Sequence, residues 1–279
     1  ILPKLGKFKY HKMINFEIVL VNYANSLYSQ SQKKNSKTGL EQGGFSKVFS
    51  YGPKDIDQDF YIKNRRILNQ KKGNGYWLWK PYFIKKALEK LNFGDHLFYC
   101  DSGSYFIDSI KNLILLSDLD QDMMVFELPF LEKQYTKRDT FVLMGCDSER
   151  YSNSNQILGG YCLWKKSDFT IKFVDDWLKY AQDERIITDN KNECGLPDYD
   201  AFIAHRHDQS IFSLLCKKNS LKVHRDPSQF GNESIANYNN SKYQQLLVLT
   251  RQKKIGFSLS TFFYILYLFK TKLIKMINE

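Results

Sequence analysis

Short apolar runs alternate with amphipathic stretches along most of the chain. Residues 16–21 (FEIVLV) and 96–100 (HLFYC) have the length of buried strands, and polar residues follow each run. Pro81 is a favoured first residue of a helix, and the apolar residues after it lie on one helical face. These residues are Phe83, Ile84, Ala87, Leu88 and Leu91.

The remaining segments extend this alternation. Further strands are predicted at 140–146, 158–164 and 221–224, and further helices at 61–68, 167–182 and from Ile211 onward. Polar and glycine-containing stretches predict a mobile loop at 29–44, loops at 71–75 and 188–199, and a linker at 226–242. Alternating strands and helices predict one α/β domain, spanning residues 1–242, with a mostly parallel central sheet flanked by helices.

The positive charge lies mainly at the two ends of the chain. The formal net charge is +11, and residues 251–279 hold six basic residues and one acid. The first twelve residues add four lysines and no acid. A basic protein attracts nucleic acid, anionic lipid or phosphorylated substrates. Since the middle of the chain is nearly balanced and has no recognised nucleic-acid motif, a nucleic-acid-binding protein is the less favoured alternative.

The five cysteines are scattered, and none has the C-x-x-C spacing. This pattern disfavours a zinc site and a disulfide framework, and it favours a reducing cytoplasm. No secretory signal pattern is visible at the start of the sequence, which agrees with that expectation.

Asp101 directly follows a predicted strand and opens the sequence Asp-Ser-Gly. In an open α/β sheet, ligands bind beyond the carboxyl ends of the strands, where Asn22 and Tyr23 are also expected. There Asp101 can bind a divalent cation that also contacts a diphosphate, because hard cations prefer oxygen ligands. Alternatively it only caps a turn, since Asp-Ser-Gly is typical of turns.

The segment 205–209 (HRHDQ) leads into a predicted helix. Asp208 suits the N-cap of that helix. Alternatively, His207 or Asp208 faces the site as a metal ligand or as the base that takes a proton from a hydroxyl group. The central hypothesis is that Asp101 and this segment line the same cleft.

Two tryptophans and a lysine are concentrated in residues 75–81 (GYWLWKP). A tryptophan can stack on a base or a sugar ring, and Lys80 can neutralise a phosphate. Trp77 and Trp79 are two residues apart and are expected to face opposite ways. One of them is then expected to contact a ligand and the other to anchor the following helix.

Several sequence segments together resemble a known family. They are NGYWLWKPYFIKKAL, GDHLFYCDSG, ILGGYCLWKKS with WLKYAQDERIITD, and GLPDYDAFIAHRHDQSIFSLLCKK, within roughly residues 60–225. In order and spacing they resemble bacterial glycosyltransferases of capsule and lipopolysaccharide gene clusters. The resemblance implies the nucleotide-diphospho-sugar transferase (GT-A) fold, which is related to the Rossmann fold.

The resemblance also implies a nucleotide-diphospho-sugar donor and a glycan or lipid-linked acceptor. Asp101 falls where the family carries its metal-binding Asp-x-Asp, but Gly103 replaces the second carboxylate. Mn²⁺ or Mg²⁺ is then expected at Asp101 with His207 or Asp208, or else it is bound weakly or not needed. His207 and Asp208 are the expected catalytic residues. The residues expected to bind the donor are Asn22, Tyr23, Arg65, Trp79, Lys80, Asp101, Ser102, Gly103, Gly159 and Gly160.

Residues 255–269 (IGFSLSTFFYILYLF) are almost wholly apolar and have lysines on both sides. Fifteen residues are fewer than the roughly 20 that span a bilayer. An amphipathic helix within 243–279, lying on the anionic inner face of the plasma membrane, suits the length and charge. Alternatively this helix packs on the domain.

The sequence therefore favours a glycosyltransferase of bacterial surface polysaccharide synthesis, peripheral to the cytoplasmic face of the membrane. The lipid-linked acceptors of the resembling family favour that location. A second enzyme hypothesis keeps the fold but transfers another activated group, such as a phosphate-type decoration. Gly159–Gly160, preceded by Gln156, resembles the part of the family that lies against the acceptor or the transferred sugar, where a glycine pair would allow a ring to approach the backbone closely.

Overall fold

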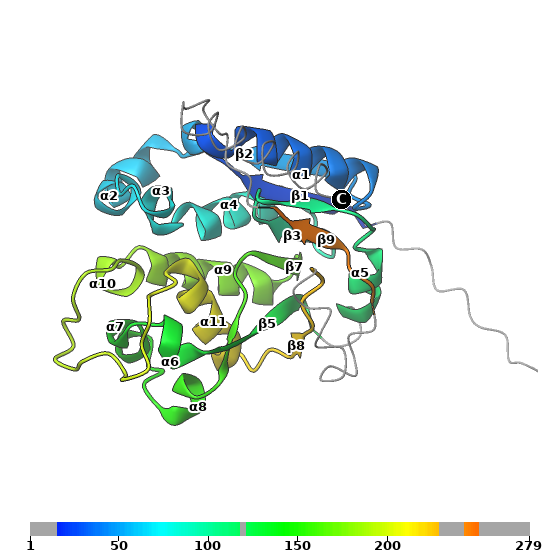
Figure 1. The fold of residues 1–279 in the computed structure, drawn as a ribbon. Coiled ribbons are helices and arrows are strands. Elements are labelled where there is room, and N and C mark those ends of the chain that lie inside the picture. The colour runs from blue at the N-terminus through cyan, green and yellow to red at the C-terminus, as the bar shows by residue number, and fades with distance from the viewer. Residues whose placement is uncertain (1–15, 118–120, 229–242, 251–279) are drawn as a thin grey trace, which may run out of the picture.

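The computed structural model describes residues 16–117, 121–228 and 243–250, and a central β-sheet lies between helices in this part of the chain (Figure 1). Within these residues the sheet has seven strands, in the order β2-β1-β3-β7-β5-β6, with β8 beside β5. They are β1 (Ile18–Tyr23), β2 (Lys47–Tyr51), β3 (His96–Cys100), β5 (Met123–Leu131), β6 (Asn155–Ile157), β7 (Tyr161–Lys165) and β8 (Val223–His224). A separate two-stranded sheet joins β4 (Ser104–Phe106) to β9 (Leu247–Leu249).

The helices differ widely in length. The longer ones are α1 (Ser29–Glu41), α2 (Gln58–Leu68), α4 (Trp79–Leu88), α9 (Asp168–Ala181) and α11 (Asp208–Lys218). The shorter ones are α3 (Gly73–Tyr76), α5 (Lys111–Ser117), α6 (Glu132–Tyr135), α7 (Arg138–Leu143), α8 (Glu149–Ser152) and α10 (Glu184–Ile187). Single 3-10 turns are formed by Ser26–Tyr28 and Pro53–Asp55.

The sheet has a parallel and a largely antiparallel half. β1 pairs in parallel with β2 and β3, so that Val19 lies between Lys47 and Leu97. β7 is antiparallel to β3 and β5, and β6 is antiparallel to β5, whereas β8 pairs in parallel with β5. The predicted α/β class with a central sheet flanked by helices is confirmed, and the N-terminal strands form its parallel part.

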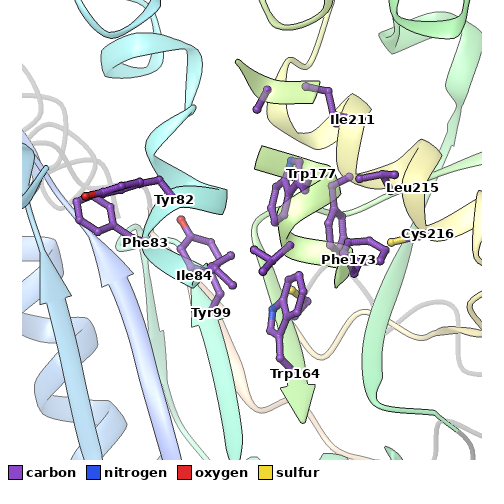
Figure 2. Close-up of a cluster of buried hydrophobic side chains, with 14 of the residues drawn as sticks. Tyr82, Phe83, Ile84, Tyr99, Trp164, Phe173, Trp177, Ile211, Leu215 and Cys216 are labelled. Carbon is purple, nitrogen blue, oxygen red and sulfur yellow. The ribbon is translucent and has the colours of Figure 1, made fainter. Parts of the chain in front are cut away.

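Alternate residues of β1 belong to two separate hydrophobic cores. Val19 and Val21 belong to the larger core, which includes residues of α4, α9 and α11 and is shown in Figure 2. In this core the ring of Trp164 stacks on that of Trp177, with centroids 6.2 Å apart. Leu20 belongs to the smaller core, together with residues of α5, β4 and β9. Both faces of the strand are buried, as its continuous apolar run predicts.

Several predicted elements are confirmed. β3 occupies the predicted range, β1 starts two residues late, and the strand predicted at 158–164 is β7. The predicted helices are α2, α4, α9 and α11. α9 follows Ser167, whose hydroxyl accepts a hydrogen bond from the backbone N–H of Thr170, a favoured N-cap.

The predicted mobile loop at 29–44 is wrong, because residues 29–41 form α1. The sequence of this helix (SQSQKKNSKTGLE) has no apolar stripe. It packs through polar and small residues: the buried Asn35 amide donates to the Ser104 carbonyl (2.9 Å), and a Cβ added at Gly39 would lie 2.5 Å from a Leu20 methyl carbon. A polar buried face leaves no hydrophobic period in the sequence.

The predicted strand at 140–146 is also wrong, because most of this run lies in α7 and the turn after it. A short apolar run is compatible with a buried helix as well as with a strand. Here the surroundings decide: Phe141 is fully buried, and the Thr140 hydroxyl donates to the Ile186 carbonyl of α10 (2.9 Å).

Residues 243–250 belong to the same domain as the sheet, since Tyr243, Leu246 and Leu247 are buried in the smaller core. Most of the predicted linker (229–242) and the apolar segment 255–269 lie outside the described residues. Among the residues that are described, no helix has the length and apolar character needed to cross a membrane.

Candidate active site

The end of β3 presents the carboxylate of Asp101. The five residues of β3 are buried, whereas the Asp101 side chain is 44% exposed. The main chain closes the turn that follows, since the Ser104 N–H donates to the Asp101 carbonyl (3.2 Å). The carboxylate itself accepts a hydrogen bond from the Tyr99 hydroxyl (2.6 Å). Asp101 is therefore more than a cap of its own turn.

Lys80 of α4 joins Asp101 to two other segments. Its Nζ lies 3.5 Å from Asp101 Oδ1 and 2.7 Å from Asp208 Oδ2, and it donates to the Gly159 carbonyl (3.0 Å). Burial alone would lower the pKa of Lys80, but the two carboxylates raise it, so the ammonium stays charged. Its three N–H groups face three protein oxygens, so Lys80 links segments here instead of presenting a cation to an exposed phosphate.

Asp208 is the first residue of α11, and the predicted N-cap role is wrong because His207 occupies the N-cap. The Asp208 side chain is only 5% exposed. Burial raises the pKa of Asp208 to about 6, and the attraction of Lys80 opposes this rise. The end of β3 and the HRHDQ segment thus meet at one ammonium group, as the central hypothesis requires.

Gly159 brings the connection between β6 and β7 against α11. Its N–H donates to Gln209 Oε1 (3.1 Å), and an added Cβ would lie 3.1 Å from the Gln209 Cβ. The Gly160 carbonyl accepts a hydrogen bond from the Asp101 N–H (2.8 Å). Glycine at position 159 therefore makes room for a protein side chain, where the sequence predicts the close approach of a sugar ring.

A polar network behind Gln209 was not predicted to belong to the site. The Gln209 amide donates to Gln156 Oε1 (2.8 Å), which also accepts from the Arg206 guanidinium (3.3 Å). Gln156 is fully buried and donates to Glu132 Oε1 (3.1 Å). Arg206 and Gln209 lie within the HRHDQ segment, so the sequence could have pointed to them. Glu132 lies in a stretch with no feature that marks it as part of a site.

The ring of His207 has partners of its own. Its Nδ1 lies 2.8 Å from the Ile187 carbonyl and therefore carries the proton. The ring stacks on Trp77, with centroids 5.5 Å apart, and Nε2 lies 3.7 Å from Asp189 Oδ1. Burial lowers the pKa of His207 to about 4, so the ring is neutral near pH 7.

Residues 73–77, which include the short element α3, form one turn in the left-handed conformation and not a right-handed helix. All five φ angles are positive, between 51° and 94°, although three of the residues are not glycine. This conformation costs roughly 1–2 kcal/mol for each non-glycine residue, so the turn needs support from its surroundings. The Asn74 amide donates to the Tyr23 hydroxyl, and Trp79 Nε1 donates to the Gly73 carbonyl (2.9 Å).

Tyr23, Trp79 and Ser102 connect this turn to the end of β3. The rings of Tyr23 and Trp79 stack with centroids 3.7 Å apart, and both side chains are buried. The Ser102 hydroxyl donates to the Tyr23 carbonyl (2.6 Å). The two tryptophans have different partners, since Trp77 stacks on His207. Of the two, only Trp77 is partly exposed.

Three residues predicted to bind the donor lie apart from the Lys80 cluster. Asn22 is fully buried, and its amide donates to Asn35 Oδ1 (2.8 Å) on α1. The Gly103 carbonyl accepts a hydrogen bond from the Thr250 N–H (2.8 Å). Arg65 is exposed on α2. Asn22 and Gly103 therefore have structural contacts in this fold, and Arg65 faces a shallow pocket shared with Glu184 of α10.

In the described part of the chain, no three His, Cys, Asp or Glu side chains form a group that could hold a metal ion. Asp101 and His207, the predicted ligands, have separate partners. A single exposed carboxylate suits a cation that arrives together with a phosphorylated substrate. Mg²⁺ is commonly bound by one or two carboxylates together with phosphate oxygens and water. Asp101 is the exposed carboxylate of the cluster, and Lys80 with its two aspartates carries a net charge of −1, which attracts a cation.

No family model and no curated protein matches the sequence. Three solved structures are similar in fold. The mouse xyloside xylosyltransferase 1 apo form has 9% identity and a TM-score of 0.46, with 84% of this chain and 97% of that chain covered. The galactosyltransferase LgtC with donor and acceptor sugar analogues has 13% identity and a TM-score of 0.45, with 83% and 86% covered. The bifunctional glycosyltransferase WbbM apo structure has 7% identity and a TM-score of 0.47, with 85% and 46% covered.

Proposed function

We propose that the chain is a glycosyltransferase that moves a sugar from a nucleotide-diphosphate donor to a glycan or lipid-linked acceptor. The observation that carries this proposal is the partly exposed Asp101 at the end of β3, beside the buried ion pair of Lys80 and Asp208. The carboxyl ends of strands are where α/β proteins bind nucleotides. A carboxylate held there is suited to a cation-bound diphosphate.

In this proposal Asp101 contacts the donor's diphosphate through Mn²⁺ or Mg²⁺. When bound, the cation stabilises the negative charge of the leaving diphosphate. Lys80 holds the Asp101 carboxylate from the protein side, and Asp208 holds Lys80. Both are therefore positioning residues. The bond from Ser102 to the Tyr23 carbonyl fixes the turn that carries Asp101.

His207 is the proposed acceptor of the hydroxyl proton. Its Nε2 is unprotonated and has no hydrogen-bond partner among the described residues, but the ring is buried, so an acceptor hydroxyl reaches this nitrogen only if the side chains that cover it move. A neutral imidazole can accept a hydrogen bond from an acceptor hydroxyl, although a pKa of about 4 makes His207 a weak base near pH 7. The partly exposed ring of Trp77 beside it offers a surface on which a sugar ring can stack.

The proposed setting is bacterial surface polysaccharide synthesis at the inner face of the plasma membrane. It is supported by the resemblance of the segments between residues 60 and 225 to capsule and lipopolysaccharide glycosyltransferases. It is also supported by the lysine-flanked apolar sequence 255–269, which suits an interfacial helix. The sugar and the acceptor are to be identified by mass analysis of the product, which would also reveal transfer of a non-sugar group.

Calorimetric titration with UDP, GDP and CDP, each with and without Mn²⁺, tests the proposal. We expect one of these nucleotides to bind, and Mn²⁺ to strengthen its binding. Asp101→Asn should weaken binding at least about tenfold, because a contact to a charged group contributes roughly 1.5–3 kcal/mol.

Asp108→Asn is the matched control. Asp108 is exposed in the same region, and its carboxylate accepts the Ser109 N–H (2.7 Å). This variant should bind nucleotide like the wild type. If the wild type binds no nucleotide under any of these conditions, the proposed function is wrong. If Asp101→Asn binds normally, the role of Asp101 is wrong.

A further inference from the structure

A basic and partly apolar surface covers the outer side of α2. Tyr61, Ile62, Lys63, Arg65 and Arg66 are all exposed, and we call them the α2 surface. The Ile62 residue is 53% exposed. The helix is kinked at Asn64 (φ −112°, ψ 16°), so Tyr61 and Ile62 lie before the kink and Arg65 and Arg66 lie after it. Exposed apolar and basic side chains therefore follow one another along this short helix.

The basic residues of the α2 surface are not neutralised by ion pairs. Lys72, just beyond the helix, pairs with Asp189 (2.8 Å). In the part of the chain that the structure describes, no such pair involves Lys63, Arg65 or Arg66. The α2 helix itself has three basic residues and one acid. The surface therefore keeps an uncompensated positive charge.

Arg65 and Arg66 also line a shallow pocket of about 480 Å³. Its other walls are Asn69 and Gln70, at the end of α2, and Glu184, the first residue of α10. Guanidinium and amide N–H groups are donors that match phosphate oxygens, and arginine can bind a phosphate with two parallel hydrogen bonds. Glu184 is the one acid of the pocket and lies on the α10 side.

We infer that the α2 surface docks on an anionic lipid bilayer and that the α2–α10 pocket takes a lipid phosphate. Charge complementarity selects an anionic partner. The exposed Ile62 and Tyr61 favour a bilayer over a small soluble anion, because an interface would cover these apolar groups and a small anion would leave them in water. The inference depends on the proposed function in one respect, namely that the acceptor is expected to be lipid-linked.

Docking at this surface would orient the enzyme. Figure 1 shows α2 and α10 at the same end of the molecule, on its two opposed halves. The pocket is lined by both helices, so a bilayer here faces the edge where the halves meet. Stable peripheral attachment generally takes two membrane contacts. The α2 surface would be a second contact beside the helix expected at 255–269.

Cosedimentation of the full chain with vesicles tests the inference. Vesicles of phosphatidylcholine alone are compared with vesicles containing about 30% phosphatidylglycerol, a content that creates a negative surface potential. The triple variant Lys63→Gln, Arg65→Gln, Arg66→Gln should bind the anionic vesicles on the order of 100-fold more weakly, since each basic residue contributes about fivefold. Ile62→Ser should weaken binding by a smaller factor.

The matched control removes the same charge elsewhere. Lys33, Lys54 and Lys179 are exposed on other elements, and their replacement by Gln should change vesicle binding far less. Both triple variants should keep the wild-type melting temperature, because every altered side chain is exposed.

Two results would overturn the inference. Equal losses in both triple variants would mean that only total charge matters. Wild-type vesicle binding by the α2 variant would mean that the surface does not meet lipid, even if that variant lost binding of inorganic phosphate. The measurement uses neither donor nor Mn²⁺, so its failure and a failure of nucleotide binding are separate outcomes.

Discussion

The turn after β3 and the first turn of α11 each bring one carboxylate to Lys80, yet in different environments. The Asp101 side chain is 44% exposed, whereas the Asp208 side chain is 5% exposed and burial raises its pKa to about 6. Their nearest oxygens lie 3.5 Å and 2.7 Å from the same ammonium nitrogen. Asp101 is therefore the carboxylate that a ligand can contact, whereas Asp208 holds the Lys80 ammonium from inside the protein.

Removing the Lys80 ammonium should disrupt the contacts of both carboxylates and cause the largest loss of stability. Lys80→Met leaves Asp208 buried without its cation, so we expect the free energy of unfolding to fall by about 3–5 kcal/mol in a urea titration. Adding Asp208→Asn should recover part of this loss, because the buried charge is then absent. Wild-type stability of Lys80→Met would show that the two regions are held together by other contacts.

Asp208→Asn should change the pH dependence of stability. The pKa of Asp208 is about 6 in the folded protein against 3.8 for the free side chain, so the folded state binds this proton more tightly. Its contribution favours folding at low pH and is lost as the pH rises from about 4 to 6, a difference on the order of 3 kcal/mol. Relative to the wild type, Asp208→Asn should lack this decline when unfolding is followed across that range.

His207 should affect the pH dependence of stability in the opposite direction and therefore serves as a control. Its pKa is lowered from 6.5 to about 4, so the unfolded chain binds this proton more tightly and the contribution to stability rises with pH in that window. His207→Gln should therefore flatten the rise, whereas Asp208→Asn should steepen it. If both variants shift the profile in the same direction, the protonation assigned to one of the two residues is wrong.

Gly159→Ala should disturb the packing of the β6–β7 connection against α11, and Gly160→Ala should disturb it less. The added Cβ would lie 3.1 to 3.3 Å from three carbon atoms of Gln209, so we expect a loss of about 1–3 kcal/mol in chemical unfolding. At Gly160 the nearest atom to an added Cβ is the flexible Asp101 Oδ2, at 3.4 Å. Gly160→Ala should therefore cost less. A larger loss for Gly160→Ala would contradict this packing.

Asp101→Asn should have the smallest effect on stability. Ion pairs with a well-exposed partner contribute about 0–1 kcal/mol, so the unfolding free energy should change by no more than that. The same variant is expected to lose nucleotide binding. A stability loss as large as that of Lys80→Met would remove the distinction between the exposed and the buried carboxylate.

The sequence predicts most of the long elements that carry an apolar pattern, apart from β5 and the run 140–146, and it misses α1, which carries none. α9 buries apolar residues at helical spacing, β3 and α11 bury nearly continuous runs, and the ranges of all three are close to the predicted ones. α1 buries Asn35 and Gly39 instead, and the Asn35 side chain is hydrogen-bonded to Asn22 of β1, 13 residues away, and to Ser104 of β4, 69 residues away. Such long-range polar packing has no periodic signature in the sequence.

For the candidate site, the sequence singles out the two carboxylates but not the lysine that connects them. Asp101 follows a strand and Asp208 precedes a helix, and both positions are readable from the sequence. A lysine beside Pro81 at the start of a helix suggests an exposed cation, whereas Lys80 is 4% exposed. Its burial depends on Gly159 and α11, so only the tertiary structure reveals it.

The surroundings of Lys80 also have a consequence for how the chain folds. Its ammonium contacts segments that are far apart in sequence, and Gly159 alone is 79 residues away. Contacts of such separation tend to form slowly, because the entropy of closing the intervening loop must first be overcome. The ammonium can lose its water only after α11 has docked. During synthesis, therefore, a nascent chain carries the strand of Asp101 long before it can assemble the site, and emergence of α11 from the ribosome is the step that permits completion.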